Sequence, residues 1–309
     1  HELPGKIIQY RKYNKLKTTY IDALPELIID ETKRIHSTFN QTITSTGRLS
    51  STNPNFQNIP IRTKEGREIR KAFCSQKKNW KIFSADYSQV ELRIMAHMSK
   101  DPGLILAFKN KIDIHLETAS KVFNVSKDDV LPEMRRTAKI VNFGIMYGAG
   151  PFRMSQELGI SRHEAVSLIE SYFIQYSGIK TYINKILNQA REMKYVETLL
   201  GRRRPVWDAS SDNGLRRKAA ERMAINMPIQ GSAAELIKLA MLSIRNLIKE
   251  YKLKSKLTLQ IHDELLFELP PEEEEFLVKN VVEIMESAIK LKVPLIVDYG
   301  VGDNWFEAH

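Results

Sequence analysis

Two aspartates follow short apolar stretches, where an unpaired carboxylate is unexpected. Asp86 lies in KIFSADYSQVELR, and Asp263 lies in KLTLQIHDELLFEL. Removing a lone carboxylate from water costs several kcal/mol unless a partner compensates it, and otherwise the group tends to take up a proton. For either acid alone, an ordinary turn at the end of a strand is a sufficient explanation. Two such acids in one chain suggest a shared function.

A pair of acids on neighbouring strands would create a cation site. Like charges a few Å apart cannot both ionise unless a cation lies between them. Mg²⁺ prefers one or two carboxylates together with substrate phosphates, and two ions about 4 Å apart can clamp the attacking and leaving oxygens of a phosphoryl displacement. We therefore expect Asp86 and Asp263 to bind metal ions in a phosphoryl-transfer site.

The stretch around Asp263 allows two structures. A straight strand would place one set of residues on a single face: Leu257, Leu259, Ile261, Asp263, Leu265 and Phe267. A tight hairpin at His262–Glu264 would instead make Asp263 a turn residue.

The segment MRRTAKIVNFGIMYGAG predicts a helix with a chemically ordered face. Four of its side chains recur at intervals of four residues: Arg135, Lys139, Phe143 and Tyr147. Each step shifts the side chain by only about 40° around the helix axis and by about 6 Å along it. One face of the helix therefore carries two cations followed by two aromatic rings. A nucleoside triphosphate offers phosphates to the cations and a base to an aromatic ring. A solvated basic turn followed by core aromatics is the alternative, and Gly144 and Gly148 weaken it because they suggest close approach or bending.

Charge and composition favour a polyanionic partner. The net charge is +10 and the pI is about 9.4, and basic residues cluster at 62–71, 202–204 and 216–218. Arginine binds phosphate in a bidentate manner, although basic runs often serve only solubility.

The single cysteine, Cys74, excludes an internal disulfide and fits the cytoplasm, and no apolar run reaches the ~20 residues of a membrane span. Because the first residue is His1, we expect a fragment or processed piece, and we expect a monomer.

The elements that must position these residues lie at both ends of the chain. We predict a strand at 81–87 followed by a helix at 89–98, and a mostly helical block at 100–195 in which Ser161 and Glu164 form a capping box. YVETLLGRRRPVW predicts two short strands around a basic turn, and a later long helix is expected to be interrupted near Pro228 and Gly231. Further strands are expected at KLTLQIHDELLFEL and PLIVDYGVG. Together they indicate an α+β domain with an inserted helical subdomain.

These motifs resemble those of family A DNA polymerases, the bacterial DNA polymerase I type. Motif A is DYSQVELR (Asp86–Arg93), motif B is RRTAKIVNFGIMYG (Arg135–Gly148) and motif C is HDE (His262–Glu264). TSTGRLSSTNPNFQNIPIRT and MPIQGSAAELIK are also similar to family segments, and the match covers nearly the whole chain in order. The resemblance implies a cupped-hand fold, with an antiparallel palm sheet at 1–98 and 225–309 and mostly helical fingers at 99–224. The thumb and the exonuclease or exonuclease-like domain of the family lie upstream of this segment.

The resemblance also implies residue roles in template-directed DNA synthesis. Two Mg²⁺ ions would be bound by Asp86, Asp263 and the backbone carbonyl of Tyr87. The phosphates of the incoming deoxynucleoside triphosphate would be held by Arg135, Lys139 and His115, with Phe143 stacking on the nucleotide and Tyr147 beside the templating base. The primer-template DNA would be contacted by Arg48, Arg62, Asn226, Gln230 and His262, of which Arg62 would bind a primer phosphate.

Glu91 has two interpretations. Ser88 and Glu91 fit a capping box, in which Glu91 only closes the helix that follows Asp86. The resemblance implies instead that Glu91 faces the sugar and fills the space of a ribose 2′-hydroxyl.

Two other functions fit part of the pattern. A single-subunit RNA polymerase of the phage type shares the two acids and a similar helix, but it lacks a glutamate at the position of Glu91. A non-catalytic nucleic-acid-binding module would explain the basic surface, yet binding alone needs no metal-binding carboxylates. The pattern therefore favours a DNA polymerase active in replication or repair.

Overall fold

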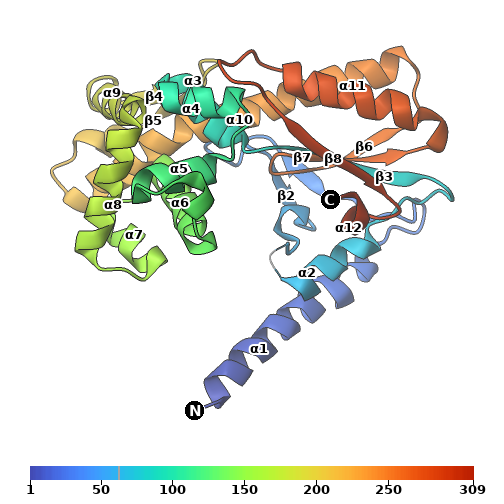
Figure 1. Ribbon diagram of the computed structural model, residues 1–309. Coiled ribbons are helices and arrows are strands. Elements are labelled where there is room, and N and C mark those ends of the chain that lie inside the picture. Colours follow the sequence, from blue (N-terminus) through green and yellow to red (C-terminus); the bar gives the residue numbers. More distant parts are fainter. Residues whose placement is uncertain (62) are drawn as a thin grey trace. The chain divides into compact units, whose positions relative to one another are not determined.

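The chain forms two compact units, each assembled from separated stretches. The computed structural model describes residues 1–61 and 63–309. Unit 1 comprises His1–Asp86, Met241–Ile284 and Val297–His309, and unit 2 comprises Tyr87–Ala240 and Met285–Ile296. Antiparallel strands from both ends of the chain flank a long helical block (Figure 1), which confirms the expected α+β class. The predicted boundaries of palm and fingers stay a prediction, because the compact units are defined by packing and not by function.

The elements follow the sequence patterns closely. The strands are β1 (Thr38–Asn40), β2 (Ser50–Thr52), β3 (Lys81–Tyr87), β4 (Tyr195–Glu197), β5 (Arg203–Pro205), β6 (Lys256–Ile261), β7 (Glu264–Leu269) and β8 (Val297–Gly302). The helices before residue 150 are α1 (Leu3–Leu16), α2 (Lys64–Glu68), α3 (Val90–Ser99), α4 (Pro102–Lys109), α5 (Ile114–Phe123) and α6 (Pro132–Met146). Those after it are α7 (Pro151–Leu158), α8 (Arg162–Gln175), α9 (Ser177–Met193), α10 (Gly214–Glu250), α11 (Glu274–Ser287) and α12 (Trp305–Ala308).

Unit 1 is organised by a four-stranded sheet with the order β6-β7-β3-β8. β3 pairs with β7 in antiparallel register, with Phe83 opposite Phe267 and Asp86 opposite Glu264. Side chains alternate between the two faces of a strand. One face therefore carries the stacked rings of Phe83 and Phe267, whose centroids lie 5.2 Å apart. The other face carries Asp86 and Glu264 at one end of the strand pair.

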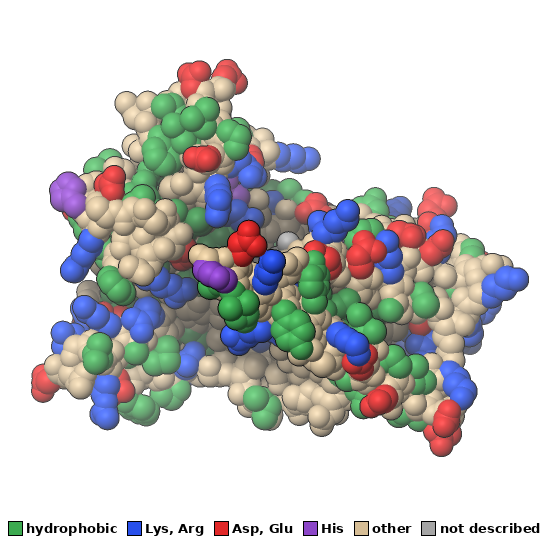
Figure 2. Space-filling view, turned by 90° about the horizontal axis from the view of Figure 1, so that it is seen from below, with side chains coloured by type: hydrophobic (Ala, Val, Ile, Leu, Met, Phe, Trp, Pro, Cys, Tyr) green, Lys and Arg blue, Asp and Glu red, His purple; other side chains and the backbone are tan. Residues whose placement is uncertain are grey.

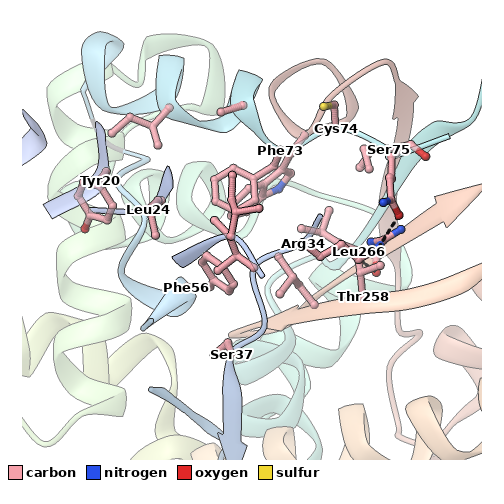
Figure 3. Close-up of a pocket in the computed structure, with 18 of the residues that line it drawn as sticks. Tyr20, Leu24, Arg34, Ser37, Phe56, Phe73, Cys74, Ser75, Thr258 and Leu266 are labelled. Carbon is pink, nitrogen blue, oxygen red and sulfur yellow. Dashed lines mark hydrogen bonds between the residues drawn. The ribbon is translucent and has the colours of Figure 1, made fainter. Parts of the chain in front are cut away.

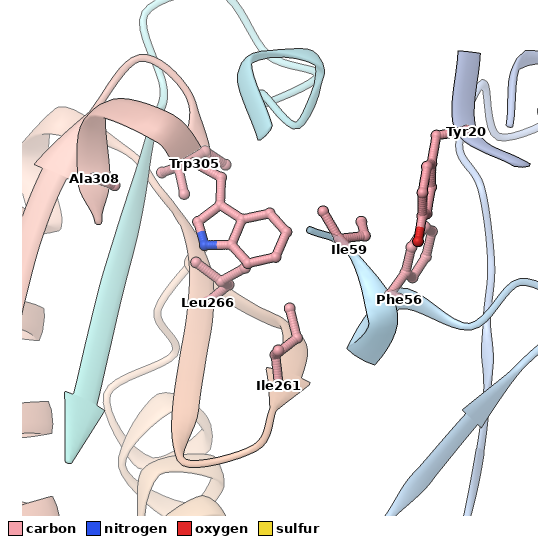
Figure 4. Close-up of a cluster of buried hydrophobic side chains, with 8 residues drawn as sticks. Tyr20, Phe56, Ile59, Ile261, Leu266, Trp305 and Ala308 are labelled. Carbon is pink, nitrogen blue, oxygen red and sulfur yellow. The ribbon is translucent and has the colours of Figure 1, made fainter. Parts of the chain in front are cut away.

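The acid-bearing face continues into a hydrophobic core. Leu266 in the middle of β7 and Ile261 at the end of β6 pack in one cluster with Trp305 of α12. Phe56 and Tyr20 close the cluster from the N-terminal part of unit 1 (Figure 4), and the Tyr20 hydroxyl donates to the Asn58 carbonyl at 2.7 Å. The large buried side chains make this end of β7 rigid, so the acids stand on a fixed support.

Side-chain caps mark the beginnings of two helices of unit 2. The capping box of α8 is confirmed, with Ser161 and Glu164 satisfying one another's backbone N–H groups. Asp101 caps α4, and its second carboxylate oxygen accepts from the Gly178 N–H at 2.9 Å. The hairpin β4–β5 is also as predicted. The buried Asp101 cap therefore also fixes α4 against α9.

The long helix differs from the prediction. α10 runs without interruption from Gly214 to Glu250 and contains Pro228, where a break was expected. Proline removes one helical hydrogen bond, but Pro228 and Ile229 are buried, and the Ser232 hydroxyl donates to the Pro228 carbonyl. Tertiary packing on both sides of the proline therefore overrides its local preference. In the described part of the chain, no helix combines the length and apolarity that a membrane crossing requires.

Candidate active site

Asp263 lies in a tight hairpin, not in a straight strand. β6 ends at Ile261 and β7 begins at Glu264, so His262 and Asp263 form the turn between them. His262 has φ +57°, the left-handed conformation that such two-residue turns require. Of the two alternatives, the straight strand with Leu257 to Phe267 on a single face is therefore excluded, because the turn reverses the chain. The turn nevertheless places Asp263 next to Glu264, which faces Asp86 across the β3–β7 pair.

Asp86 lies in an environment that disfavours its negative charge. Its Oδ1 atom is buried and has no hydrogen-bond partner among the described residues. Burial, and then the negative charges of Asp263 and Glu264, raise the pKa of Asp86 to about 7. Such repulsion is relieved when a cation binds between the carboxylates. The donors fit a hard divalent ion, although the described residues contain no cluster of three or more histidine, cysteine or acidic ligands.

Glu264 is the centre of a buried network that the sequence did not reveal. Its Oε1 atom accepts hydrogen bonds from the Ser84 hydroxyl at 2.6 Å and the Trp305 Nε1–H at 2.7 Å, and lies 3.2 Å from Nδ1 of His309. Burial opposes ionisation, but the hydrogen bonds from His309 and Ser84 outweigh it and lower the pKa of Glu264. The Arg70 guanidinium lies 3.9 Å from the centre of the Trp305 ring. Glu264 is thus held ionised and immobile beside the two aspartates.

In unit 2, the beginning of α5 meets the first turns of α6. Asp113 caps α5 through the N–H groups of His115 and Leu116 and binds Arg135 of α6 at 2.7 Å. His115 is 3% exposed, and burial lowers its pKa to about 4. The Asn142 Nδ2–H donates to Nδ1 of His115 at 3.1 Å, which assigns the ring proton to Nε2. His115 is therefore a neutral hydrogen-bond donor at pH 7.

The aromatic face of α6 continues this arrangement. The Phe143 ring lies 5.8 Å from the His115 ring and 6.2 Å from the Tyr147 ring. Tyr147 follows the last helical residue, and its hydroxyl donates to Glu91 Oε2 at 2.7 Å. The sequence spacing thus correctly predicted a shared face for Phe143 and Tyr147.

The predicted capping box at Ser88 and Glu91 is absent. The N-cap of α3 is Gln89, which has φ +52° and makes no side-chain capping bond. Glu91 is 7% exposed and bonds to Tyr147 instead. A turn in the left-handed conformation moves Ser88 outside the cap position, so the cap cannot explain Glu91.

The two glycines of motif B both mark close contacts. A Cβ atom on Gly144 would lie 2.6 Å from Cε of Met154. A Cβ atom on Gly148, which has φ +67°, would lie 3.2 Å from Cα of Arg222 on α10. The absence of a side chain at Gly144 thus lets α7 pack closely, and its absence at Gly148 does the same for α10, in agreement with the close approach expected from the sequence.

The remaining predicted site residues are distributed over both units. In unit 2, Lys139 is exposed on α6, Asn226 and Gln230 are half-buried on α10, and Tyr87 is buried with its hydroxyl donating to the Met285 carbonyl at 2.7 Å. In unit 1, Arg48 is half-buried and His262 is exposed. Arg62 lies outside the described residues. Each unit therefore carries its own group of predicted site residues.

A cavity of about 900 Å³ lies in unit 1 on the acid-bearing side of the sheet. Its walls include Phe56, Phe73, Leu266 and Trp305 (Figure 3). At one end Arg34 forms a bidentate pair with Glu268, with both N–O distances 2.7 Å. The lining is mainly apolar, and it contains none of the predicted site residues that the structure describes.

Basic side chains are widespread on the surface. Lys and Arg recur over much of the face shown in Figure 2, with acidic side chains between them. Together with the net charge of +10, they favour contact with a polyanion.

Comparisons with known proteins give a consistent result. The family model described as DNA polymerase family A matches residues 1–307. DNA polymerase I of Bacillus caldotenax is 51% identical over 309 residues, which are 100% of this chain and 35% of that protein. Thermostable DNA polymerase I of Thermus aquaticus is 48% identical over 308 residues, 100% of this chain and 37% of that protein. The chain therefore spans about a third of the length of these relatives.

A solved structure is similar over the whole chain. The POL domain of Pol1 from M. smegmatis, in complex with DNA primer-template and dNTP, superposes with a TM-score of 0.96. The identity is 46%, and the match covers 100% of this chain and 54% of that one.

Proposed function

The chain belongs to DNA polymerase family A, and from this premise we propose that it extends a DNA primer along a template strand. The primer 3′ oxygen would attack the α-phosphorus of a deoxynucleoside triphosphate, and the bond to pyrophosphate would break. The proton of the 3′-hydroxyl would leave to solvent. The observation that carries the proposal is the buried Oδ1 of Asp86, which faces the Asp263–Glu264 turn and has no hydrogen-bond partner among residues 1–61 and 63–309. Three crowded acids in a basic protein suit a cation-assisted phosphoryl transfer.

Asp86 and Asp263 would hold two Mg²⁺ ions, with the backbone carbonyl of Tyr87 as a further ligand. Bound ions would stabilise charge on the attacking and leaving oxygens. Glu264 would hold the turn in place and add negative charge to the site, because its Oε1 atom already accepts from Ser84 and Trp305 and lies beside His309.

The incoming nucleotide would be bound by the face of α6 and the start of α5. Arg135 and Lys139 are exposed cations, and the pair with Asp113 orients the Arg135 guanidinium. The neutral His115 would donate its Nε2–H to a phosphate oxygen, so this contact would persist over the physiological pH range. Phe143 would stack on the nucleotide, and Tyr147 would lie beside the templating base.

Glu91 would select the sugar. Its carboxylate is fixed by the Tyr147 hydroxyl and has no capping role. A fixed side chain can reject a ribose 2′-hydroxyl by filling its space. The primer-template would be contacted by Arg48, Arg62, Asn226, Gln230 and His262.

Primer extension with Mg²⁺ tests the proposal against both alternatives. The assay contains a labelled DNA primer on a DNA template, with deoxynucleotides in one arm and ribonucleotides in the other. We expect extension with deoxynucleotides only, and only when a template is present. Efficient extension with ribonucleotides would indicate an RNA polymerase-like enzyme. Tight DNA binding with no extension in either arm would indicate a non-catalytic binding module.

A further inference from the structure

Trp207 is a rigidly presented, exposed indole. It opens the short 3₁₀ turn Trp207–Ser210 after β5 and is 72% exposed. Its neighbours Val206 and Ala209 are buried, at 2% and 1% exposure. They anchor the backbone of the turn in unit 2, and the indole projects from it into solvent.

Hydrogen bonds fix the same turn to the end of α9. The Val206 N–H donates to the Lys194 carbonyl at 2.8 Å, and the Lys194 ammonium group donates to the Ser210 hydroxyl at 2.7 Å. The Ser210 hydroxyl also donates to the Arg191 carbonyl at 3.2 Å. Because the exposed indole buries little area on folding, it adds little to stability and is available to bind a partner.

Basic and aromatic groups adjoin Trp207. β5 leads directly into the turn, and its Arg203 guanidinium lies 4.6 Å from the centre of the Tyr195 ring. The Arg203 side chain is 65% exposed even though it pairs with Glu197 at 3.3 Å. Residues 191–208 contain five basic side chains and three acidic ones, so the segment is net positive.

We propose that Trp207 and the β4–β5 hairpin bind an unpaired DNA strand, with the indole stacked on one base and the arginines contacting phosphates. Aromatic side chains combined with a positive surface are the general means of binding single-stranded nucleic acid. In a duplex both faces of an internal base are covered by its neighbours, so apart from the terminal base pairs only an unpaired strand can offer a base to Trp207. The inference rests on the proposed function, whose substrate carries an unpaired template strand beyond the primer.

Tryptophan fluorescence tests the contact directly. The chain contains three tryptophans, and subtracting the Trp207→Phe signal from that of the wild type isolates Trp207. Two probes are titrated without nucleotide: a primer-template with a long 5′ template overhang, and the blunt duplex of the same primer. We expect the Trp207 signal to be quenched by the overhang substrate and unchanged by the blunt duplex. Equal quenching by both, or quenching by neither, would overturn the proposal.

Affinity measurements with matched variants provide the second readout. Trp207→Ala is expected to weaken binding of the overhang substrate about tenfold, as loss of one stacked base does, and to leave blunt-duplex binding unchanged. Trp207→Phe, which keeps an aromatic ring, is expected to restore most of the affinity. Ile174→Ala removes another exposed apolar side chain of unit 2, 75% exposed on α8, and is expected to bind like the wild type. Unchanged overhang binding by Trp207→Ala would contradict the inference and favour a protein partner at this surface.

The outcome can be separated from that of the proposed function. Overhang-dependent quenching in a chain that extends no primer would retain the inference and reject the polymerase proposal. Primer extension in a chain whose Trp207 is silent to DNA would do the reverse.

Discussion

The Tyr147 hydroxyl at the end of α6 donates a hydrogen bond to the Glu91 carboxylate at the start of α3, with Oη and Oε2 2.7 Å apart. The contact fixes a buried acid that the local sequence would otherwise explain as a helix cap. Since Gln89 is the N-cap and makes no side-chain bond, the position of Glu91 is set by tertiary structure. Both residues would therefore act together on the nucleotide.

Glu91→Ala is expected to relax sugar selection. If the fixed carboxylate rejects ribose by a clash, the mutant should use ribonucleotides markedly better while retaining deoxynucleotide addition, at a reduced rate. The measurement is the ratio of kcat/KM for a deoxynucleotide to that for its ribonucleotide. Tyr147→Phe, which removes only the hydrogen bond, should lower the ratio less than Glu91→Ala does. A ratio unchanged in both variants would show that Glu91 does not face the sugar.

Asp86→Asn and Asp263→Asn should each abolish nucleotide addition while primer-template binding survives. Each removes a proposed metal ligand, whereas affinity for DNA comes mainly from phosphate contacts. The pKa of Asp86 is raised to about 7, so its charge is disfavoured in the metal-free fold at higher pH. Asp86→Asn should consequently raise the free energy of unfolding by about 1–2 kcal/mol at pH 8 without Mg²⁺. Near-normal extension by either variant, with binding intact, would contradict the metal assignment.

Lys139→Ala should raise the KM for nucleotide and lower kcat. The proposed contact stabilises charge on the phosphates, and such charge increases in the transition state. A loss of at least about tenfold in kcat/KM is expected from removal of one charged contact. Arg136→Ala is the matched control, because Arg136 is an exposed cation on the same helix but off the proposed face. Equal losses of kcat/KM in both variants would show that Lys139 contributes only general positive charge and makes no specific phosphate contact.

Much of the fold could be predicted because it depends on local chemistry. The strand that ends near Asp86, the capping box at Ser161 and the hairpin at Arg203 all follow from patterns within a few residues. The uninterrupted α10 could not be predicted, because burial around Pro228 decides it.

The candidate site divides in the same way. The spacing in motif B indicated the face shared by Phe143 and Tyr147. The contact of His309 with Glu264 spans 45 positions, and the pairing of Asp113 with Arg135 joins two helices. Periodicity and capping rules concern residues close together in the sequence, so they cannot predict contacts between residues that only the tertiary structure brings together.

Gly148→Ala should destabilise the chain by more than Gly159→Ala. Both glycines have φ near +67°, at +67° and +68°, so both variants carry the conformational cost of about 1–2 kcal/mol for a left-handed alanine. A Cβ atom at residue 148 would also lie 3.2 Å from the Arg222 Cα atom, whereas at residue 159 no atom of the described residues would lie within 4 Å of it. The difference between the two unfolding free energies, measured by denaturant titration, reports the contact with α10. Equal destabilisation would mean that α10 can move away from an alanine at position 148 with no loss of unfolding free energy.

Acid should weaken the fold through His115. Burial lowers its pKa from 6.5 to about 4, so above pH 6.5 the ring is neutral in both the folded and the unfolded chain. As the pH falls from about 6.5 to 4, the unfolded chain binds a proton that the folded chain excludes, and the free energy of unfolding decreases. We expect this contribution to be about 1–2 kcal/mol after allowance for solvent screening.

His115→Gln should flatten that slope between pH 6.5 and 4. The pKa of His97 is also lowered by burial and that of Asp86 is raised to about 7, so the wild-type slope contains these groups as well, and only the difference between wild type and variant isolates His115. Asp113 belongs to a lower window, because the bond from Arg135 lowers its pKa below the ordinary 3.8 despite burial. The measurement is the denaturant midpoint at half-unit pH steps. Parallel pH profiles for the two proteins would show that the fold leaves the pKa of His115 near 6.5, and the neutral donor assigned to it would then be protonated at mildly acidic pH.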